Sequence, residues 1–280
     1  MQSPEARNID QRVVDGFGDE WSRFDQSTVD EAELRRGFDE YFAIFPWDRV
    51  PPDATGFDLG CGSGRWARFV APRVGRLHCI DASRAALQVA QRNLARFPNC
   101  VFAHASVDEL PLPDGSAQFG YSLGVLHHVP DTAAGIRACA QKLAKGAPLL
   151  LYLYYRFDNR PRWYAAIWRI SELPRRFISR LSARPRAAAC ALIAVTVYWP
   201  LARFSRFVEA LGGRGDRLPL HYYSRRSLYT MRTDALDRFG TALEQRFTKR
   251  EIEQMMRDAG LRDIVFSDRP PYWCAVGIRE

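Results

Sequence analysis

The 280-residue chain lacks the cysteine and histidine patterns of metal sites and disulfide frameworks. Its six cysteines stand singly, with no C-x-x-C pair and no histidine cluster at ligand spacing. We therefore expect reduced thiols, no bound metal and a cytoplasmic location. The first ten residues are polar and contain no apolar core of the kind found in secretion signals, which argues against secretion.

Internal repeats, low-complexity tracts and long apolar runs are also missing. The main apolar run, residues 187–199, ends at Pro200 and is too short to span a bilayer. Two interpretations of this run stay open. It is a buried helix, or it is a membrane-surface helix whose flanking arginines contact lipid.

Charge is unevenly distributed along the chain. The net charge is +8, but residues 1–155 carry −3, residues 156–218 carry +9 and residues 219–280 carry +2. A partner that favours positive charge is therefore expected at residues 156–218, where peripheral membrane contact is one option. RNA is a weaker option because no recognisable RNA-binding module accompanies the basic segment, so we expect no nucleic-acid partner.

A glycine-rich loop occupies residues 57–64, with glycines at alternate positions 60, 62 and 64. Glycine permits a sharp turn that lies against a ligand, and the helical spacing of residues 65–74 would direct free N–H groups at that ligand. The same letters satisfy the dinucleotide fingerprint Gly-x-Gly-x-x-Gly/Ala. Against that interpretation, the carboxylate of Asp58 would repel a pyrophosphate and attract an ammonium group, such as that of a methionine-type cofactor.

Strand and helix patterns alternate around this loop. Such alternation predicts a parallel sheet with right-handed crossovers, whose ligands bind at the carboxyl ends of the strands. The Gly loop, Asp81, Ser106 and His127 all fall at such ends. The predicted strands are residues 56–59, 76–80, 100–105, 119–123 and 148–154.

The flanking segments define the expected domains. Residues 1–55 are predicted to form helices that pack on the core or cover its ligand. The alternation stops at residues 156–245, which we expect to form a helical lid over the strand ends. It resumes at residues 246–280 with a capping box at Thr248 and Glu251 and a terminal hairpin of residues 261–267 and 272–278. Residues 56–155 and 246–280 together would form the core.

This constellation resembles class I S-adenosylmethionine-dependent methyltransferases of the methyltransferase-11 type, over residues 56–155 and 246–280. The resemblance is carried by the loop from Asp58 to Gly64, by Asp81, by the segment Leu-His-His-Val-Pro-Asp that ends at Asp131, and by the terminal hairpin. It implies an α/β Rossmann-like, doubly wound, mostly parallel seven-stranded sheet with an antiparallel terminal hairpin and a helical lid insertion. It also implies S-adenosylmethionine as cofactor and S-adenosylhomocysteine as product.

The resemblance assigns residues to the cofactor. Asp81 would accept hydrogen bonds from both ribose hydroxyls, and Ser106 stands where an aspartate usually contacts the adenine amino group. Gln118 is a second departure, because an aspartate usually opens that strand. The expected cofactor-binding residues are Asp58, Gly60, Cys61, Gly62, Gly64, Asp81, Ala82, Ser106, Val107 and Leu123.

Catalysis is expected to depend mainly on alignment, with a base for an acceptor that must lose a proton. His127 is the candidate base, or alternatively a capping or packing residue, and His128 is expected to face away. Tyr154 and Asp158 are further catalytic candidates. The candidate acceptor-binding residues are Tyr155, His221, Tyr222 and Arg225.

The sequence thus predicts methyl transfer to an oxygen or nitrogen of a small-molecule, sugar or natural-product acceptor. Three alternatives stay open. The acceptor is a lipid-linked or quinone-like molecule at the membrane surface, the acceptor is RNA, or the protein binds the cofactor without turnover.

Overall fold

A computed structural model of the chain describes residues 8–280. These residues form two compact units. The first unit comprises residues up to Asp25 together with Leu34–Arg156 and Leu243–Glu280, and the second comprises Gln26–Glu33 and Phe157–Ala242. The predicted insertion therefore forms a compact unit of its own.

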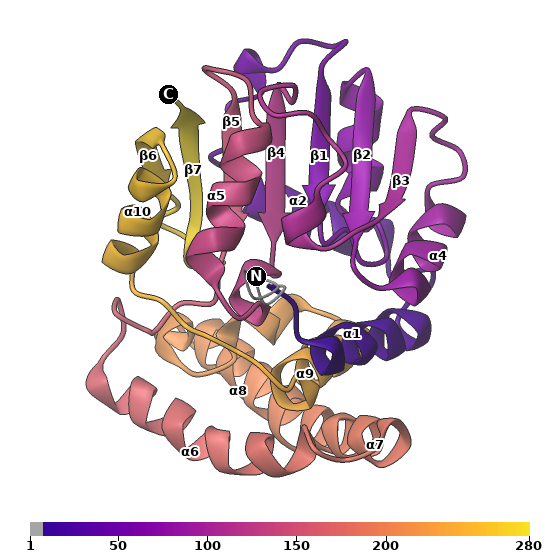
Figure 1. The fold of residues 1–280 in the computed structure, drawn as a ribbon. Helices are drawn as coiled ribbons and strands as arrows, with labels where there is room; N and C mark the ends of the chain where they lie inside the picture. The colour runs from indigo at the N-terminus through magenta and orange to yellow at the C-terminus, as the bar shows by residue number, and fades with distance from the viewer. Residues whose placement is uncertain (1–7) are drawn as a thin grey trace, which may run out of the picture. The chain divides into compact units, whose positions relative to one another are not determined.

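The first unit is built on a seven-stranded sheet of order β3-β2-β1-β4-β5-β7-β6 (Figure 1). The first five strands of this order are parallel, and β7 pairs antiparallel with both β5 and β6. This confirms the predicted fold. The strands are β1 Thr55–Leu59, β2 Arg76–Asp81, β3 Cys100–His104, β4 Phe119–Leu123, β5 Pro148–Tyr152, β6 Leu261–Phe266 and β7 Cys274–Arg279.

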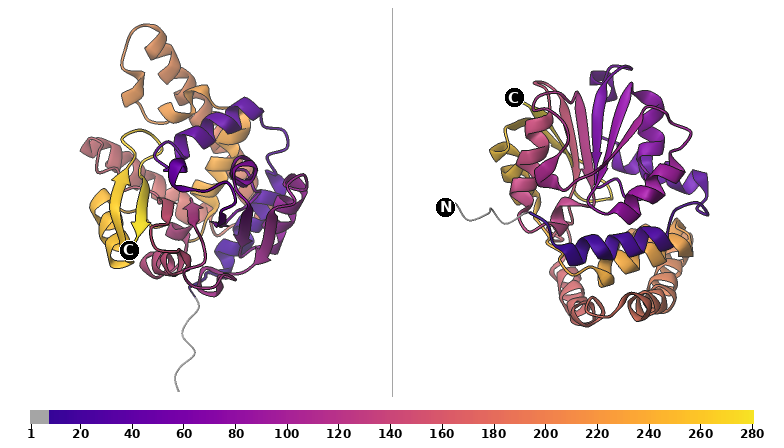
Figure 2. Two further views of the ribbon diagram at one scale, coloured as in Figure 1. Left: turned by 90° about the horizontal axis from the view of Figure 1, so that it is seen from above. Right: turned by 45° about the vertical axis from the view of Figure 1, so that its right-hand side comes forward.

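Central strands are covered on both faces, which explains their continuous apolar runs. Every residue of β4 is buried, as are four of five in β1 and in β5. Helices α5 and α10 pack side by side (Figure 2). They supply Ile136, Cys139, Ile252 and Met256 to the main core. The helices of this unit are α1 Gln11–Arg23, α3 Ala67–Val70, α4 Arg84–Asn93, α5 Thr132–Lys142 and α10 Lys249–Asp258, with most of α2 Glu31–Tyr41.

The helix after the Gly loop is shorter than expected. Residues 65–74 were predicted as one helix, but α3 ends at Val70 and continues as the 3₁₀ turn Ala71–Arg73. Pro72 lies within that turn and has no backbone N–H to extend the α-helical ladder. The predicted capping box at the start of α10 is confirmed, with Thr248 and Glu251 bonding each other's backbone.

The second unit is helical, as predicted for the insertion. Its helices are α6 Arg162–Ile178, α7 Ala183–Ile193, α8 Trp199–Ala210 and α9 Leu228–Gly240. A π-helical turn, Ala194–Tyr198, joins α7 to α8 in one continuous helix. The helix continues past Pro200, at which the apolar run ends, because Pro200 sits in the first turn after the π segment, where a missing N–H is tolerated.

The continuous helix Ala183–Ala210 is long and apolar enough to cross a membrane by length and composition. The mean hydropathy of its most apolar 18-residue window is 1.5, and only 22% of that window is buried within the protein. The helix also begins with Arg184 and Arg186 and carries Arg203 and Arg206 near its end.

Candidate functional site

The Gly loop connects β1 to α3 at the carboxyl end of the sheet. The amides of Gly60 and Cys61 both donate to the Ile80 carbonyl, at 2.8 and 3.0 Å, which holds the loop against β2. Gly62 has φ +54°, and a Cβ atom there would lie 2.8 Å from the Trp21 indole. Only glycine satisfies both the left-handed backbone and this close approach.

Asp81 ends β2 and organises the loop. Its Oδ2 accepts from the Gly62 amide and its Oδ1 from the Ser83 amide, both at 2.8 Å. Burial raises the pKa of Asp81, and the two amide donors offset part of that rise. Each carboxylate oxygen has two acceptor sites, so each retains one for a ligand. The side chain can thus accept from two neighbouring hydroxyls, as a ribose offers.

Asp58 is a buried carboxyl group within β1, only 2% exposed. Its Oδ2 has no hydrogen-bond partner among residues 8–280, and burial raises the pKa of Asp58 to about 8. A buried carboxylate oxygen without a donor is costly unless a ligand supplies one. An ammonium group is the donor that would restore its charge, so Asp58 fits the amino end of a methionine-type cofactor.

A cavity of about 110 Å³ lies beside these residues. Five of the predicted cofactor residues line it: Gly60, Asp81, Ala82, Ser106 and Val107. The Ser106 hydroxyl is buried and has no hydrogen-bond partner among the described residues, so it is available to an adenine amino group. The other five, Asp58, Cys61, Gly62, Gly64 and Leu123, are not part of the lining.

Helix α1 fills much of this cavity and was not predicted residue by residue. Val13, Val14, Phe17 and Trp21 line the cavity opposite the loop, and their spacing of three and four residues is the signal that places them on one helix face. Typical ligand pockets hold 300–1,000 Å³. The accessible space beside α1 is therefore smaller than that of a typical ligand pocket.

Both ends of α1 are fastened to the core. The side-chain nitrogen of Asn8, Nδ2, donates to the Asp131 carbonyl at 2.7 Å. The backbone N–H of Asp131 donates back to Asn8 Oδ1, also at 2.7 Å. After α1, the Asn93 side chain donates to the carbonyls of Asp25 and Ser63 at 2.7 and 2.9 Å. These hydrogen bonds add to the packing of α1 on α4 and on His128, and together they hold the helix beside the loop.

Two histidines follow β4 in the 3₁₀ turn Leu126–His128. His127 is fully buried, stacks on Tyr154 with ring centroids 3.9 Å apart, and is not among the residues that line the cavity. Burial, His128 and Arg246 lower the pKa of His127 well below its usual value. Neither ring nitrogen of His127 has a hydrogen-bond partner within residues 8–280.

His128, which was expected to face away, lines the cavity instead. Its ring contacts Phe17 of α1 with centroids 5.0 Å apart. Its Nδ1 lies 2.7 Å from the Leu243 carbonyl, which can only accept, so Nδ1 carries the proton. The other ring nitrogen, Nε2, is then the one that can accept a proton. The 3₁₀ geometry turns His128 to the cavity, and helical spacing did not reveal this.

Comparison with known proteins agrees with this geometry. A family model described as a methyltransferase domain matches residues 57–146, which include the Gly loop, Asp81, Ser106 and both histidines. The chain is an S-adenosylmethionine-dependent methyltransferase. Its class I domain carries the insertion described above after β5.

Curated relatives and a solved structure are similar to this methyltransferase over different lengths. The demethylmenaquinone methyltransferase of Bacillus licheniformis is 24% identical over 173 residues, 54% of this chain and 73% of that protein. The ubiquinone biosynthesis O-methyltransferase of Alkalilimnicola ehrlichii is 34% identical over 109 residues, 38% of this chain and 43% of that protein. The S-adenosylmethionine-dependent methyltransferase SibL in its apo form has the same fold, with a TM-score of 0.52 and 14% identity over 88% of this chain and 55% of SibL.

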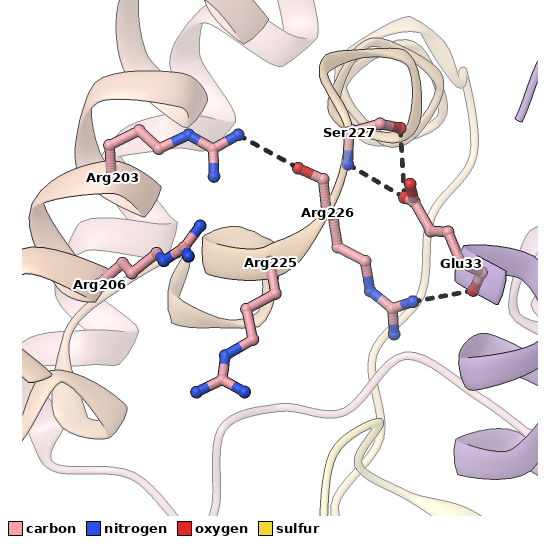
Figure 3. A pocket seen from close by; sticks show the side chains of 6 residues that line it. All are labelled: Glu33, Arg203, Arg206, Arg225, Arg226 and Ser227. Atoms are coloured by element: carbon pink, nitrogen blue, oxygen red, sulfur yellow. Dashed lines mark hydrogen bonds between the residues drawn. The ribbon is translucent and has the colours of Figure 1, made fainter. Parts of the chain in front are cut away.

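Three predicted acceptor-binding residues of the methyltransferase lie in the second unit, in the 3₁₀ segment His221–Arg225. His221 bonds Ser205 of α8 through Nδ1 at 2.8 Å, and Tyr222 accepts from Arg226 at 3.2 Å. Both contacts support the local fold. Arg225 lines a cavity of about 560 Å³ that belongs wholly to this unit (Figure 3).

That cavity is strongly basic. It is lined by Glu33, Arg203, Arg206, Arg225, Arg226 and Ser227. Arg226 donates to the Glu33 carbonyl at 3.3 Å and Arg203 to the Ser224 carbonyl at 2.9 Å, whereas Arg206 and Arg225 have no ion pair or side-chain hydrogen bond within residues 8–280. Two guanidinium groups are therefore available to an anionic group of a ligand.

The remaining predicted residues are divided between the units. Tyr155 belongs to the first unit, where its ring packs on Tyr272 at 5.6 Å between centroids. Asp158 belongs to the second unit and is exposed. Within residues 8–280, no group of three or more histidine, cysteine, aspartate or glutamate side chains is arranged to hold a metal ion.

Proposed function

We propose that this methyltransferase acts on an oxygen or nitrogen of a small-molecule acceptor, with sugars and natural products as the leading class. The observation that carries the proposal is the imidazole of His128 in the cavity wall, whose Nδ1 donates to the Leu243 carbonyl and whose Nε2 is the ring nitrogen that can accept a proton. A hydroxyl or ammonium nucleophile must lose a proton, and a positioned imidazole nitrogen can receive it.

The cofactor would be held by residues of the first unit. When bound, S-adenosylmethionine supplies an electrophilic methyl group. Asp81 would accept from the ribose hydroxyls, Ser106 from the adenine amino group, and Asp58 would pair with the ammonium group. Helix α1 would cover the bound cofactor with Phe17 and Trp21 and exclude water from the cavity.

In this proposal His127 and Tyr154 pack against His128 and fix the position of its ring. Their stacked rings lie against the His128 ring, with a centroid distance of 4.0 Å between the two histidines. Because burial lowers the pKa of His127 well below its usual value, His127 holds a proton less readily than an exposed imidazole does. We therefore assign proton acceptance to His128 and keep His127 as the second candidate for the base.

A second candidate function is methylation of a quinone-like or lipid-linked acceptor. It is supported by the two similar curated relatives, which are named for menaquinone and ubiquinone methylation. An anionic headgroup of a lipid-linked acceptor would also suit the two available arginines of the basic cavity.

The experiment is a product-detected methylation screen with purified protein and S-adenosylmethionine. The acceptor panel contains sugars, phenols and amines, each beside an analogue whose hydroxyl or amine is already methylated, and hydroquinones with and without an isoprenoid tail. We expect a one-methylene mass gain on the unblocked oxygen or nitrogen acceptors only. Turnover restricted to the hydroquinones, at a ring carbon or at a ring hydroxyl, would replace the first proposal by the second.

A further inference from the structure

Helix α6 of the second unit turns its apolar side chains outward. Trp163, Ile167, Ile170, Leu173 and Phe177 are 47%, 48%, 67%, 68% and 68% exposed. Their spacing of three and four residues places them on one stripe along about four turns of the helix. A helix that packs on its own protein normally shows the reverse arrangement, with apolar side chains inward.

A row of arginines borders this stripe. Arg162, Arg169 and Arg176 follow one another at seven-residue intervals, which is two helical turns, so they lie along the same edge. All three are exposed and have no ion pair or side-chain hydrogen bond among the described residues. Segment 157–242 as a whole carries sixteen arginines, no lysine and six carboxylates.

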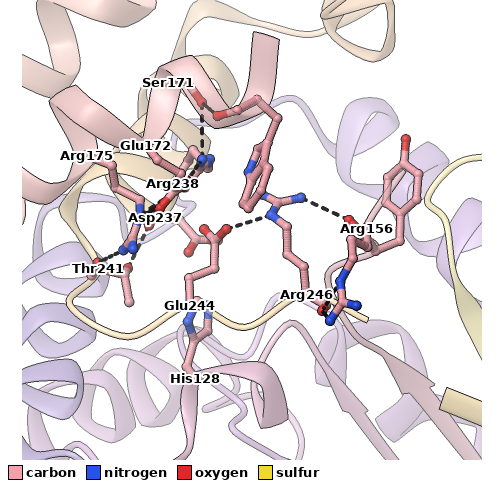
Figure 4. Close-up of polar contacts among 12 residues, drawn as sticks. His128, Arg156, Ser171, Glu172, Arg175, Asp237, Arg238, Thr241, Glu244 and Arg246 are labelled. Atoms are coloured by element: carbon pink, nitrogen blue, oxygen red, sulfur yellow. Dashed lines mark hydrogen bonds and ion pairs between the residues drawn. The ribbon is translucent and has the colours of Figure 1, made fainter. Parts of the chain in front are cut away.

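The inward face of α6 carries an ion-pair network beside the buried Ile178, and this network fixes which face turns inward. Glu172 accepts from Arg175 at 2.9 Å and from Arg238 of α9, and Arg175 also donates to the Thr241 carbonyl at 2.9 Å (Figure 4). Burial tends to raise the pKa of Glu172, but the hydrogen bonds and charges of Arg238 and Arg175 outweigh it and lower that pKa. Rotating α6 to bury the stripe would break these buried ion pairs.

A second apolar surface of this unit belongs to the continuous helix of α7 and α8. Leu192, Val195, Trp199, Phe204, Phe207 and Leu211 are 41% or more exposed along it. Isolated exposed apolar residues are ordinary, but a contiguous set rimmed by arginines marks an interaction surface.

We infer that α6 is an interfacial helix that docks this protein on an anionic phospholipid surface. The outward stripe enters the boundary between headgroups and acyl chains, with the helix axis parallel to the membrane. Arg162, Arg169 and Arg176 then reach the lipid phosphates from one edge of the stripe. Charge complementarity selects this occupant, because a second copy would set one arginine-rich surface against another.

The test uses the full chain and sedimentation with phosphatidylcholine vesicles, prepared with and without phosphatidylglycerol. The wild type should bind the phosphatidylglycerol vesicles and bind less at high salt. Replacing all three arginines (Arg162→Gln, Arg169→Gln, Arg176→Gln) should weaken binding at low salt by on the order of 10²-fold. The double variant Ile170→Ser, Leu173→Ser should weaken binding by about tenfold or more at both salt concentrations.

A matched control removes three exposed arginines of the first unit, with Arg92→Gln, Arg250→Gln and Arg262→Gln. It has the same net charge as the arginine variant of α6 and should retain binding within about twofold, since only surface-proximal charges contribute. Lipids with brominated acyl chains should quench the wild-type fluorescence, and the Trp163→Phe variant should lose most of that quenching.

Several outcomes would overturn the inference. The first is that the wild type does not bind anionic vesicles. The second is that the control variant and the α6 variants lose vesicle binding equally. The third is that ultracentrifugation without lipid finds a wild-type dimer and a monomeric Ile170→Ser, Leu173→Ser variant. That last result would make a second copy the occupant. Circular dichroism checks the fold of each variant, and Leu173→Ser alone replaces the double variant if that one unfolds. S-Adenosylhomocysteine binding, measured by calorimetry, reports the methyltransferase site separately.

Discussion

The two units of this methyltransferase place their apolar side chains in opposite ways. In the first unit, β4 is buried along its whole length and α5 and α10 turn Ile136 and Ile252 toward the sheet. In the second unit, α6 turns Ile170 and Leu173 to the outside and keeps Glu172 within. Helical periodicity is equally clear in both, so periodicity identifies an amphipathic helix without telling which face is covered by protein.

The comparison also separates two kinds of function. The residues with clear cofactor chemistry, Asp58, Asp81 and Ser106, all belong to the first unit. The two arginines of the basic cavity that have no ion pair or side-chain hydrogen bond within residues 8–280, Arg206 and Arg225, belong to the second. Variants of the first unit should therefore change cofactor binding or the chemical step, whereas variants of the second should change acceptor use.

The largest expected effect concerns the two histidines. His128→Ala should lower kcat by roughly 10²- to 10⁴-fold, because the proton of the acceptor loses its receiving nitrogen. The matched variant His127→Ala should mainly lower the melting temperature, since it empties a fully buried site. Steady-state kinetics and thermal unfolding of both variants distinguish the roles. The reverse pattern would assign the base to His127.

The second largest effect is expected for substitutions of Asp81. Asp81→Ala should weaken S-adenosylhomocysteine binding by about tenfold or more, because each charge-assisted hydrogen bond contributes about 1.5–3 kcal/mol. It also removes the acceptor of the Gly62 and Ser83 amides, so Asp81→Asn serves as the control that keeps the side-chain shape. Calorimetry measures both affinities. Unchanged binding in Asp81→Ala would show that the ribose lies elsewhere.

Asp58 should make cofactor binding depend on pH. With the pKa of Asp58 near 8, its ionised fraction grows as pH rises, so the affinity for S-adenosylhomocysteine should rise by up to tenfold per pH unit between about pH 5.5 and 7.5. In Asp58→Asn the slope should disappear. Calorimetry in buffers of different ionisation enthalpy should also detect the proton that wild-type Asp58 releases on binding.

The same group makes a prediction about stability. The pKa of Asp58 is higher in the folded protein than its usual value of 3.8, so the folded state binds a proton that the unfolded chain lacks. The free energy of unfolding should therefore fall as pH rises from about 4 to about 8. Asp58→Asn removes this term, so the ligand-free variant should melt above the wild type at pH 8 and close to it at pH 4.

The smallest effect is expected in the basic cavity. Arg206→Gln with Arg225→Gln should raise the KM of an anionic acceptor several-fold, because two guanidinium groups without partners lose their charge. The affinity for S-adenosylhomocysteine should stay within about twofold. Loss of cofactor affinity in this variant would mean that the two units share the cofactor site.

Sequence reasoning recovered the core because glycine spacing and strand alternation are local signals. The Gly loop, Asp81 and Ser106 stand where they were predicted, as does the capping box at Thr248. The place of His128 could not be predicted, since a 3₁₀ turn and an α-helical turn share the same letters but direct side chains differently. The outward direction of the apolar face of α6 could not be predicted either, because it depends on the contact of Glu172 with Arg238, which lies 66 residues further along the chain.

The fastening of α1 has a consequence for the rate of turnover. Trp21 lies against Gly62, and Asn8 and Asn93 hold the two ends of the helix. We therefore expect spent cofactor to leave after these bonds break, which would make release the slowest step whenever methyl transfer is fast. A rapid-mixing experiment should then show a burst of methylated product in the first turnover, and Asn8→Ala should speed the steady state that follows.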